Sequence, residues 1–308
     1  MDQEQINKLI HQLQTKSESK LEKLFASRLK AIEDKLSVMY IKYSQDDAVL
    51  TVTDLNHYNR IQQELALIAR ELSGDFQKVV NEITASTEKV YVEQYMRSSY
   101  IYTMTTGLML PVSIPTMQEI EASLSQPIAY IKLPDRLEVI RNETIQRIVQ
   151  TISEGIMSGE GYGKTAAKLM KDLNYSRHRA LLIARTEMHR AQSTAGLETK
   201  KKFNEAGADI KTMWSSTKDS RTRETHRRLD GQLQDDKGMF HSNGCVGPAP
   251  GLLVGANSAE ENIGCRCQTI YVVNGIVPTF MRVKNEETGK SEVVPFQSYD
   301  DWMRDKGA

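Results

Sequence analysis

The sequence is poor in cysteine, in aromatic residues and in long apolar runs. Three of its 308 residues are cysteine, and aromatic residues make up 6%. So few cysteines in a chain of this length argue against a disulfide framework and fit a reducing compartment. We find no uncharged apolar run long enough to cross a bilayer and expect no membrane span. The polar, acidic start, MDQEQINKLI, does not resemble a secretory signal.

The chain also lacks net charge, because 40 basic and 40 acidic residues cancel. A globally basic composition, which would indicate a nucleic-acid-coating protein, is therefore absent, although neutrality does not exclude a local basic face. The hydrophobic content of 39% is modest and predicts long, solvent-rich helices rather than one dense globule. The length is sufficient for a sizeable core and for two domains.

Apolar residues recur every three or four positions through most of residues 1–175, which predicts helices. Residues 1–40 form one amphipathic helix in this interpretation. It packs on its own protein, forms a coiled coil or docks on a partner. A second helix is expected to end at Gly74, and a third to run from Phe76 to about Met104. The prolines of MLPVSIPTM then mark a linker.

The segment SGEGYGKTAAKL resembles a phosphate-binding loop but does not fit one. Ser158 stands where that motif requires its first glycine, and an amphipathic helix rather than a strand precedes it. We therefore expect a corner between two helices. Ser176 is expected to cap a further helix from Arg177 to about Phe203.

After NEAGAD the pattern changes. Ile210, Thr212 and Trp214 alternate as in a strand. SRTRETHRRLDG is expected to be a short helix capped by Ser220 and ended by Gly231. A long glycine-rich loop, GMFHSNGCVGPAPGLLVGANSAEENIG, follows, then a strand, CQTIYVV, and a hairpin of TFMRV and SEVVPF.

The predicted fold is therefore mainly α, with a long helical N-terminal arm and a small C-terminal α+β domain. We divide it into a helical arm (1–105), a linker and helical connector (106–175), the α+β domain (176–275), and a C-terminal hairpin and tail (276–308).

Glu187 is the most informative acidic residue. On a helix it shares a face with small apolar residues such as Ala184 and Ala191, so it is expected to point inward. A buried carboxylate needs a cationic partner. The expected partners are Arg223 and His226, three positions apart on the short helix. A catalytic carboxylate is the alternative. The predicted structural polar core contains Arg185, Glu187, Asp219, Arg223 and His226.

Basic residues gather in two segments that flank the first predicted strand. They are Lys200, Lys201, Lys202, Arg221, Arg227 and Arg228. A solvated surface is one interpretation of such charge runs, and contact with DNA phosphates is the other.

Cys265 and Cys267 lie two positions apart, whereas zinc sites commonly use Cys-x2-Cys pairs and four ligands. His226, Cys265 and Cys267 are the zinc candidates, with His241 or Cys245 as a fourth ligand. The spacing does not require a metal, so we predict no cofactor and expect the thiols to pack as small hydrophobic groups. The enzymatic alternative is a metal-dependent hydrolase or nuclease that uses Asp219, His226 and the cysteine pair.

Five sequence elements occur in a fixed order: IARTE, then W…D.R.R..H..LDGQ, Phe240, PAPG and CRC. Together they resemble the phage Mu protein F-like family, also called the head morphogenesis domain, over about residues 176–272. The length and helical arm are similar to minor head proteins of siphophages that infect Gram-positive bacteria. Gly264 departs from the family, which usually has asparagine before Cys-Arg-Cys. The family's shared residues correspond to Arg185, Glu187, Trp214, Asp219, Arg223, His226, Asp230, Gly231, Cys265 and Cys267.

The resemblance implies a protein of the virion interior, present in the host cytoplasm during assembly, with no established catalytic activity. Its implied partners are the phage portal protein, scaffold or capsid proteins and double-stranded DNA. The implied role is in head assembly and genome delivery, although the same domain also occurs fused to toxins.

Overall fold

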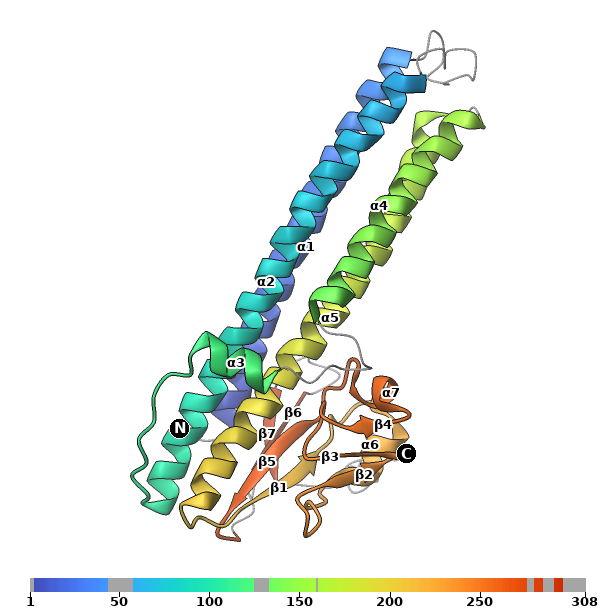
Figure 1. The fold of residues 1–308 in the computed structure, drawn as a ribbon. Coiled ribbons are helices and arrows are strands. Elements are labelled where there is room, and N and C mark those ends of the chain that lie inside the picture. Colours follow the sequence, from blue (N-terminus) through green and yellow to red (C-terminus); the bar gives the residue numbers. More distant parts are fainter. Residues whose placement is uncertain are drawn as a thin grey trace. The chain divides into compact units, whose positions relative to one another are not determined.

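The computed structural model describes residues 3–43, 58–124, 133–158, 160–275, 280–284 and 291–295. The elements are α1 (Gln3–Tyr43), α2 (Tyr58–Thr106), α3 (Met117–Ser123), α4 (Leu133–Met157), α5 (Tyr162–Glu205), β1 (Ile210–Ser215), α6 (Glu224–Leu229), β2 (Phe240–Ser242), β3 (Cys245–Gly247), β4 (Val254–Gly255), α7 (Ser258–Asn262), β5 (Gln268–Val273), β6 (Phe280–Lys284) and β7 (Ser291–Pro295) (Figure 1). The predicted fold class is confirmed.

The chain divides into two compact units, and neither follows the order of the sequence. Unit 1 combines Met1–Gln14, Ser86–Tyr130 and Arg185–Ala308, whereas unit 2 combines Thr15–Ala85 and Ile131–Ala184. Helices α1, α2 and α5 each contribute to both units. The units group residues by their contacts and not by their order in the sequence. The division of the sequence into four consecutive segments stays a prediction.

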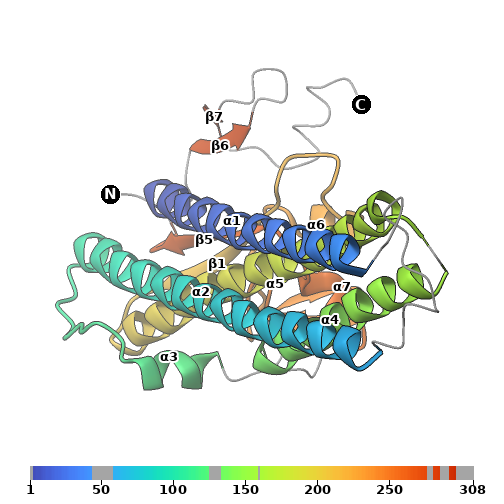
Figure 2. The ribbon, with the colours of Figure 1, turned by 90° about the horizontal axis from the view of Figure 1, so that it is seen from above.

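Unit 2 is a four-helix assembly in which stretches of α1, α2, α4 and α5 run side by side (Figure 2). Each helix contributes aliphatic residues at three- or four-residue spacing, the pattern that buries one face of a helix. The core consists of Ile32, Leu36, Leu65, Ile68, Leu72, Ile148, Ile152, Leu169 and Leu173.

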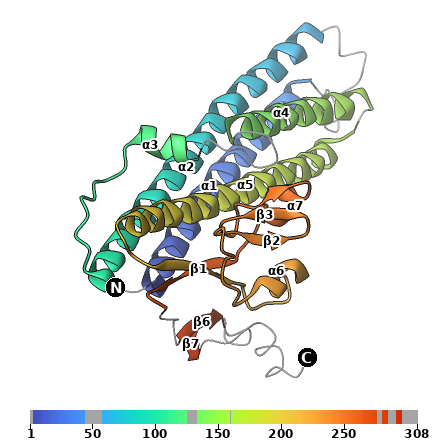
Figure 3. The same cartoon turned by 60° about the horizontal axis from the view of Figure 1, so that its bottom comes forward.

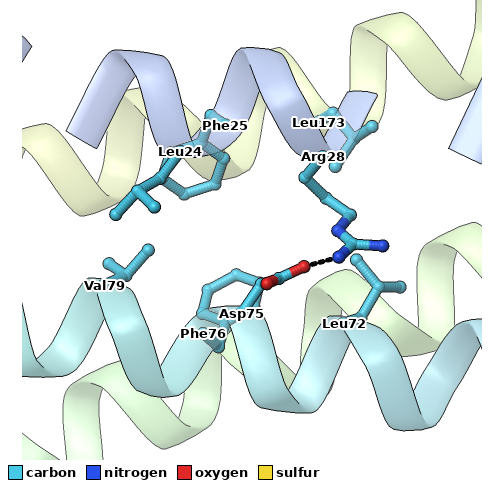
Figure 4. Close-up of a pocket in the computed structure, with 8 residues that line it drawn as sticks. All are labelled: Leu24, Phe25, Arg28, Leu72, Asp75, Phe76, Val79 and Leu173. Atoms are coloured by element: carbon cyan, nitrogen blue, oxygen red, sulfur yellow. Dashed lines mark ion pairs between the residues drawn. The ribbon is translucent and has the colours of Figure 1, made fainter. Parts of the chain in front are cut away.

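A small, mostly apolar pocket lies among these helices (Figure 4). The rings of Phe25 and Phe76 meet edge to face, with centroids 6.0 Å apart at 88°. Arg28 and Asp75 form an ion pair beside them, with 16% and 19% of their side chains exposed. Leu173 closes the pocket from α5. We interpret it as a packing gap, because the polar groups that line it bind each other.

In unit 1 the last part of α5 lies beside the antiparallel pair β1–β5 (Figure 3). In this pair Trp214 is opposite Thr269 and Ile210 is opposite Val273. A second sheet has the order β2-β3-β4, and β6 pairs with β7 in the predicted hairpin. The strands predicted from Ile210 and from CQTIYVV are thus confirmed.

Two predicted helix boundaries are wrong. Helix α2 runs through Gly74, and α5 runs through Ser176. One glycine inside a helix costs only about 1 kcal/mol, which the packing of unit 2 outweighs. The Ser176 hydroxyl is buried and bonds to the Asp172 carbonyl one turn earlier (3.1 Å) and to Thr144 (2.6 Å), so it does not cap a helix.

Two further predictions in the C-terminal part need correction. The short helix α6 has Arg223 rather than Ser220 at its N-cap position. The segment predicted as a long loop contains β2, β3, β4 and α7. These elements are two to five residues long, too short to show a periodic pattern. Gly231 ends the α6 region as predicted, with φ of 74°. Among the described residues no helix is apolar enough over a sufficient length to cross a membrane.

Candidate functional site

The three zinc candidates from the sequence lie together in unit 1. Nδ1 of His226 is 3.3 Å from the sulfur of Cys267 and 3.6 Å from the sulfur of Cys265. All three ligand atoms lie within 4.8 Å of one another. His226 is 1% exposed, Cys265 5% and Cys267 2%. The chain thus builds a compact, buried imidazole–thiol cluster from α6 and the segment that precedes β5.

Glu261 on α7 holds the other side of the imidazole. Its carboxylate lies 3.1 Å from Nε2 of His226, and it accepts hydrogen bonds from Ser242 (2.6 Å) and Thr225 (3.1 Å). Because a carboxylate only accepts, Nε2 carries a hydrogen. In the neutral ring, Nδ1 is then the lone-pair nitrogen, and it faces the two sulfurs. Glu261 therefore fixes both the orientation and the tautomer of His226.

An apolar cluster surrounds this group. The ring of Trp214 meets His226 edge to face at a centroid distance of 5.2 Å. The buried members of the cluster are Trp214, Leu229, Phe240, Cys245, Leu253, Cys265 and Cys267. The predicted packing of the thiols among hydrophobic residues agrees with this geometry.

The pKa values of the two thiols shift in opposite directions. The hydrogen bond with Cys267, together with burial, raises the pKa of the Cys265 thiol well above its usual range. Burial also raises the pKa of Cys267, but the hydrogen bond from Cys265 and the adjacent His226 imidazole outweigh it and leave that pKa well below its usual range. The site thus favours negative charge on the sulfur of Cys267.

Asp219 and Asp230 each have a defined cation. Arg266 binds both oxygens of Asp219, with one contact at 2.7 Å, and this hydrogen bond lowers the pKa of Asp219 to about 2. Lys218 pairs with Asp230, and their side chains are 3% and 1% exposed. Asp230 also accepts the backbone N–H of Ser216 at 2.7 Å. These two pairs fix the turn between β1 and α6.

Glu187 is buried as predicted (1% exposed). Its cationic partner, however, is not one of the two that we expected. Its ion pair is with Arg190 on the same helix, at 3.5 Å. Arg223 instead donates to the carbonyl of Ile263 at 2.6 Å, and His226 bonds to Glu261. The predicted pairing of Glu187 with Arg223 and His226 is therefore replaced by a cation one helical turn away.

Polar side chains on α5 bind the C-terminal part directly. His189 donates to the carbonyl of Cys267 at 2.7 Å, and Ser193 donates to the carbonyl of Pro250 at 2.8 Å. The backbone N–H of Gly264 donates to the Thr186 hydroxyl at 3.1 Å. Gly264 stands where the family usually has asparagine, and this contact uses only its backbone. Gly251 of the PAPG element has φ of 80°, and a Cβ there would lie 2.7 Å from the His189 ring.

The predicted basic patch is only partly a surface. Lys201, Lys202, Arg221 and Arg228 are exposed, and Arg227 is half-buried. Lys200 is buried, where it donates to Thr212 (2.8 Å) and Gln234 (2.6 Å), and burial lowers its pKa to about 8. The prediction that Lys200 belongs to an exposed DNA-contacting patch therefore needs correction.

Sequence reasoning missed three residues that organise the site: Lys218, Glu261 and Arg266. Lys218 and Asp230 are separated by 12 positions, and this separation gives no local signal. Glu261 lies on α7, inside the segment interpreted as loop.

The group that could hold a metal is His226, Cys265 and Cys267, and among the described residues it includes neither Asp219 nor Cys245. His241 is exposed and pairs with Asp235 at 2.8 Å. The set proposed for a metal-dependent hydrolase is thus not assembled in one place, since Asp219 is bound by Arg266.

Known proteins resemble this chain over most of its length. The model of the phage Mu protein F like family matches residues 146–270. The chain is 36% identical over 308 residues to the minor head protein GP7 of Bacillus phage SPP1, which covers 100% of this chain and 98% of that protein. It is 31% identical over 257 residues to the NAD(+)–arginine ADP-ribosyltransferase EFV of Enterococcus faecalis, covering 82% of this chain and 51% of that protein. No solved structure matches significantly. The full-length identity to GP7 shows that the chain belongs to the phage Mu protein F-like family of minor head proteins.

Proposed function

We propose that this virion protein of a tailed phage binds the portal protein inside the head, contacts packaged double-stranded DNA, and assists head assembly and genome delivery without catalysing a reaction. The observation that carries the proposal is the 36% identity to a minor head protein along the whole chain. A relationship confined to the C-terminal part would support only a shared fold.

Portal binding is supported by exposed apolar side chains from the end of α2 to the start of α3. Met104, Met109, Ile114 and Met117 are 63%, 84%, 67% and 49% exposed. Exposed apolar clusters commonly mark protein interfaces, and methionine adapts to irregular partner surfaces. These residues precede or begin α3, whose own Ile120 is buried.

A pulldown with purified portal protein tests this contact. The double variant Met109→Ser, Ile114→Ser is expected to reduce capture at least tenfold. Val139→Ser with Met170→Ser, two exposed apolar residues of unit 2, is the matched control and should leave capture unchanged. Equal capture by wild type and the first variant would refute this portal surface.

DNA contact is supported by the exposed cations Lys201, Lys202, Arg221 and Arg228. Phosphate contacts release counterions, so affinity falls with salt by a slope of about 0.9 per phosphate neutralised. Changing the four residues to glutamine is expected to lower that slope and the affinity. Changing Lys164 and Lys168 of unit 2, which are 70% and 47% exposed, is the control. Affinity that does not depend on salt would exclude this contact.

The absence of catalysis is supported by the burial of the imidazole–thiol cluster and by the engagement of Asp219 with Arg266. The ADP-ribosyltransferase relative aligns with this chain over 51% of its own length, so its activity does not transfer. Plasmid nicking measured with and without chelator tests the point. Chelator-sensitive cleavage would favour the hydrolase or nuclease alternative.

A further inference from the structure

We propose that His226, Cys265 and Cys267 bind one Zn²⁺ ion that fastens α6 to the segment leading into β5. The inference is independent of portal and DNA binding, because it concerns how the C-terminal part is held together. It rests on the geometry of the three ligand atoms, on the orientation of the imidazole and on the burial of the group.

The two nitrogen–sulfur distances are close to those of a zinc site. With Zn–S of about 2.3 Å, Zn–N of about 2.0 Å and tetrahedral angles, the sulfur and nitrogen atoms lie about 3.5 Å apart. The observed distances from Nδ1 of His226 are 3.3 Å to Cys267 and 3.6 Å to Cys265.

The imidazole is oriented as a ligand. Metal-binding histidines commonly donate their second ring N–H to a carboxylate, which fixes the ring and the tautomer. Glu261 occupies that position at 3.1 Å from Nε2, and it is 1% exposed. Ser242 and Thr225 hold the carboxylate in turn. The histidine ligand therefore has the supporting hydrogen bonds that are typical of a zinc site.

Zinc binding would leave the buried group without net charge. Zinc binds cysteine as the thiolate, so each S–H bond breaks, both protons leave to solvent, and the sulfur lone pairs form the two Zn–S bonds. Two thiolates and Zn²⁺ sum to zero. Two thiolates buried in an apolar cluster without a cation would be costly.

Burial indicates a structural role for the ion. Catalytic zinc keeps an open position that a substrate can reach, whereas these three ligands are at most 5% exposed. The described residues supply three ligands. The sulfur of Cys245 lies in the same apolar cluster but outside the ligand group.

A bound metal ion would also reinforce a small apolar cluster. Its apolar cluster has seven buried residues, and its strands are two to six residues long. Small cores of this kind are commonly reinforced by a metal or by disulfides. The three cysteines here are free, so a metal is the reinforcement that the residues allow.

Metal analysis of the full-length protein, purified without chelator from zinc-supplemented cells, tests the proposal. We expect one zinc per chain in the wild type and less than a tenth of that in Cys265→Ser and Cys267→Ser. Cys245→Ser is the matched control, since it removes a buried thiol of the same cluster and should keep the zinc. Cobalt substitution should give sulfur-to-metal absorption in the wild type and in Cys245→Ser.

Glu261→Gln tests the positioning of His226 separately. The ion should remain but bind about 10- to 100-fold more weakly, as is typical when the partner of a ligand histidine is changed. Chelator should remove zinc slowly from the folded protein and rapidly in denaturant. A metal-free wild type that shows no cobalt spectrum after refolding with cobalt overturns the proposal. Equal zinc in the wild type and both ligand variants also overturns it.

Discussion

Unit 2 and the C-terminal part of unit 1 bury different kinds of side chain. The core of unit 2 consists of isoleucine and leucine at helical spacing, whereas unit 1 buries Glu187, Lys218, His226 and Glu261. Among the described residues, the buried charged side chains all lie in unit 1. Unit 2 therefore depends mainly on apolar burial, and unit 1 also depends on polar partners that are distant in the sequence.

The largest effect is expected from breaking a buried ion pair in unit 1. Lys218→Met leaves Asp230, whose side chain is 1% exposed, without its cation. Removing one partner of a buried pair typically costs about 3–5 kcal/mol. Urea unfolding at neutral pH measures the loss. Lys211→Met, at an exposed position on β1, is the control, and an equal stability of both variants would contradict the role of this pair.

The next effect is expected from a cavity in unit 2. Leu36→Ala removes a fully buried side chain from the four-helix core and should cost about 3 kcal/mol. Hydrogen exchange of α1, α2, α4 and α5 should report the loss locally. Val38→Ala, two residues away and 62% exposed, should change stability by less than about 0.5 kcal/mol. Equal losses at the two positions would show that this core is not tightly packed.

The difference between the apolar core of unit 2 and the polar partners of unit 1 explains which features could be predicted from the sequence. The helices of unit 2 follow from apolar periodicity, and the miss at Gly74 arose because local propensity is weaker than packing. The strands of Ile210 and Tyr271 follow from alternation. The site was predictable in its residue types, since His226, Cys265 and Cys267 were singled out. Its partner Glu261, 35 positions from His226, could not be predicted, because no local pattern links α6 to α7.

A smaller, pH-dependent effect is expected at Asp219. Its folded pKa of about 2 lies below the ordinary value of 3.8, because Arg266 binds the ionised form. The stabilisation is therefore fully present above about pH 4 and is lost as the pH falls towards 2. Asp219→Asn should cost about 1 kcal/mol at pH 7 after allowance for solvent screening. Urea unfolding from pH 7 to pH 3 should show the difference shrinking below pH 4, and a constant difference would exclude ionic stabilisation.

The smallest effect on stability is expected at an exposed cation, and here stability and function separate. Arg228 is 75% exposed and pairs with Glu224 on the same helix, so Arg228→Gln should change unfolding free energy by less than about 0.5 kcal/mol. If its guanidinium contacts a phosphate, the salt slope of DNA binding falls by about 0.9. Salt-titrated DNA binding, compared with Lys164→Gln in unit 2, measures this. An unchanged slope with unchanged stability would leave Arg228 a solvated charge and move the DNA contact to the other exposed cations.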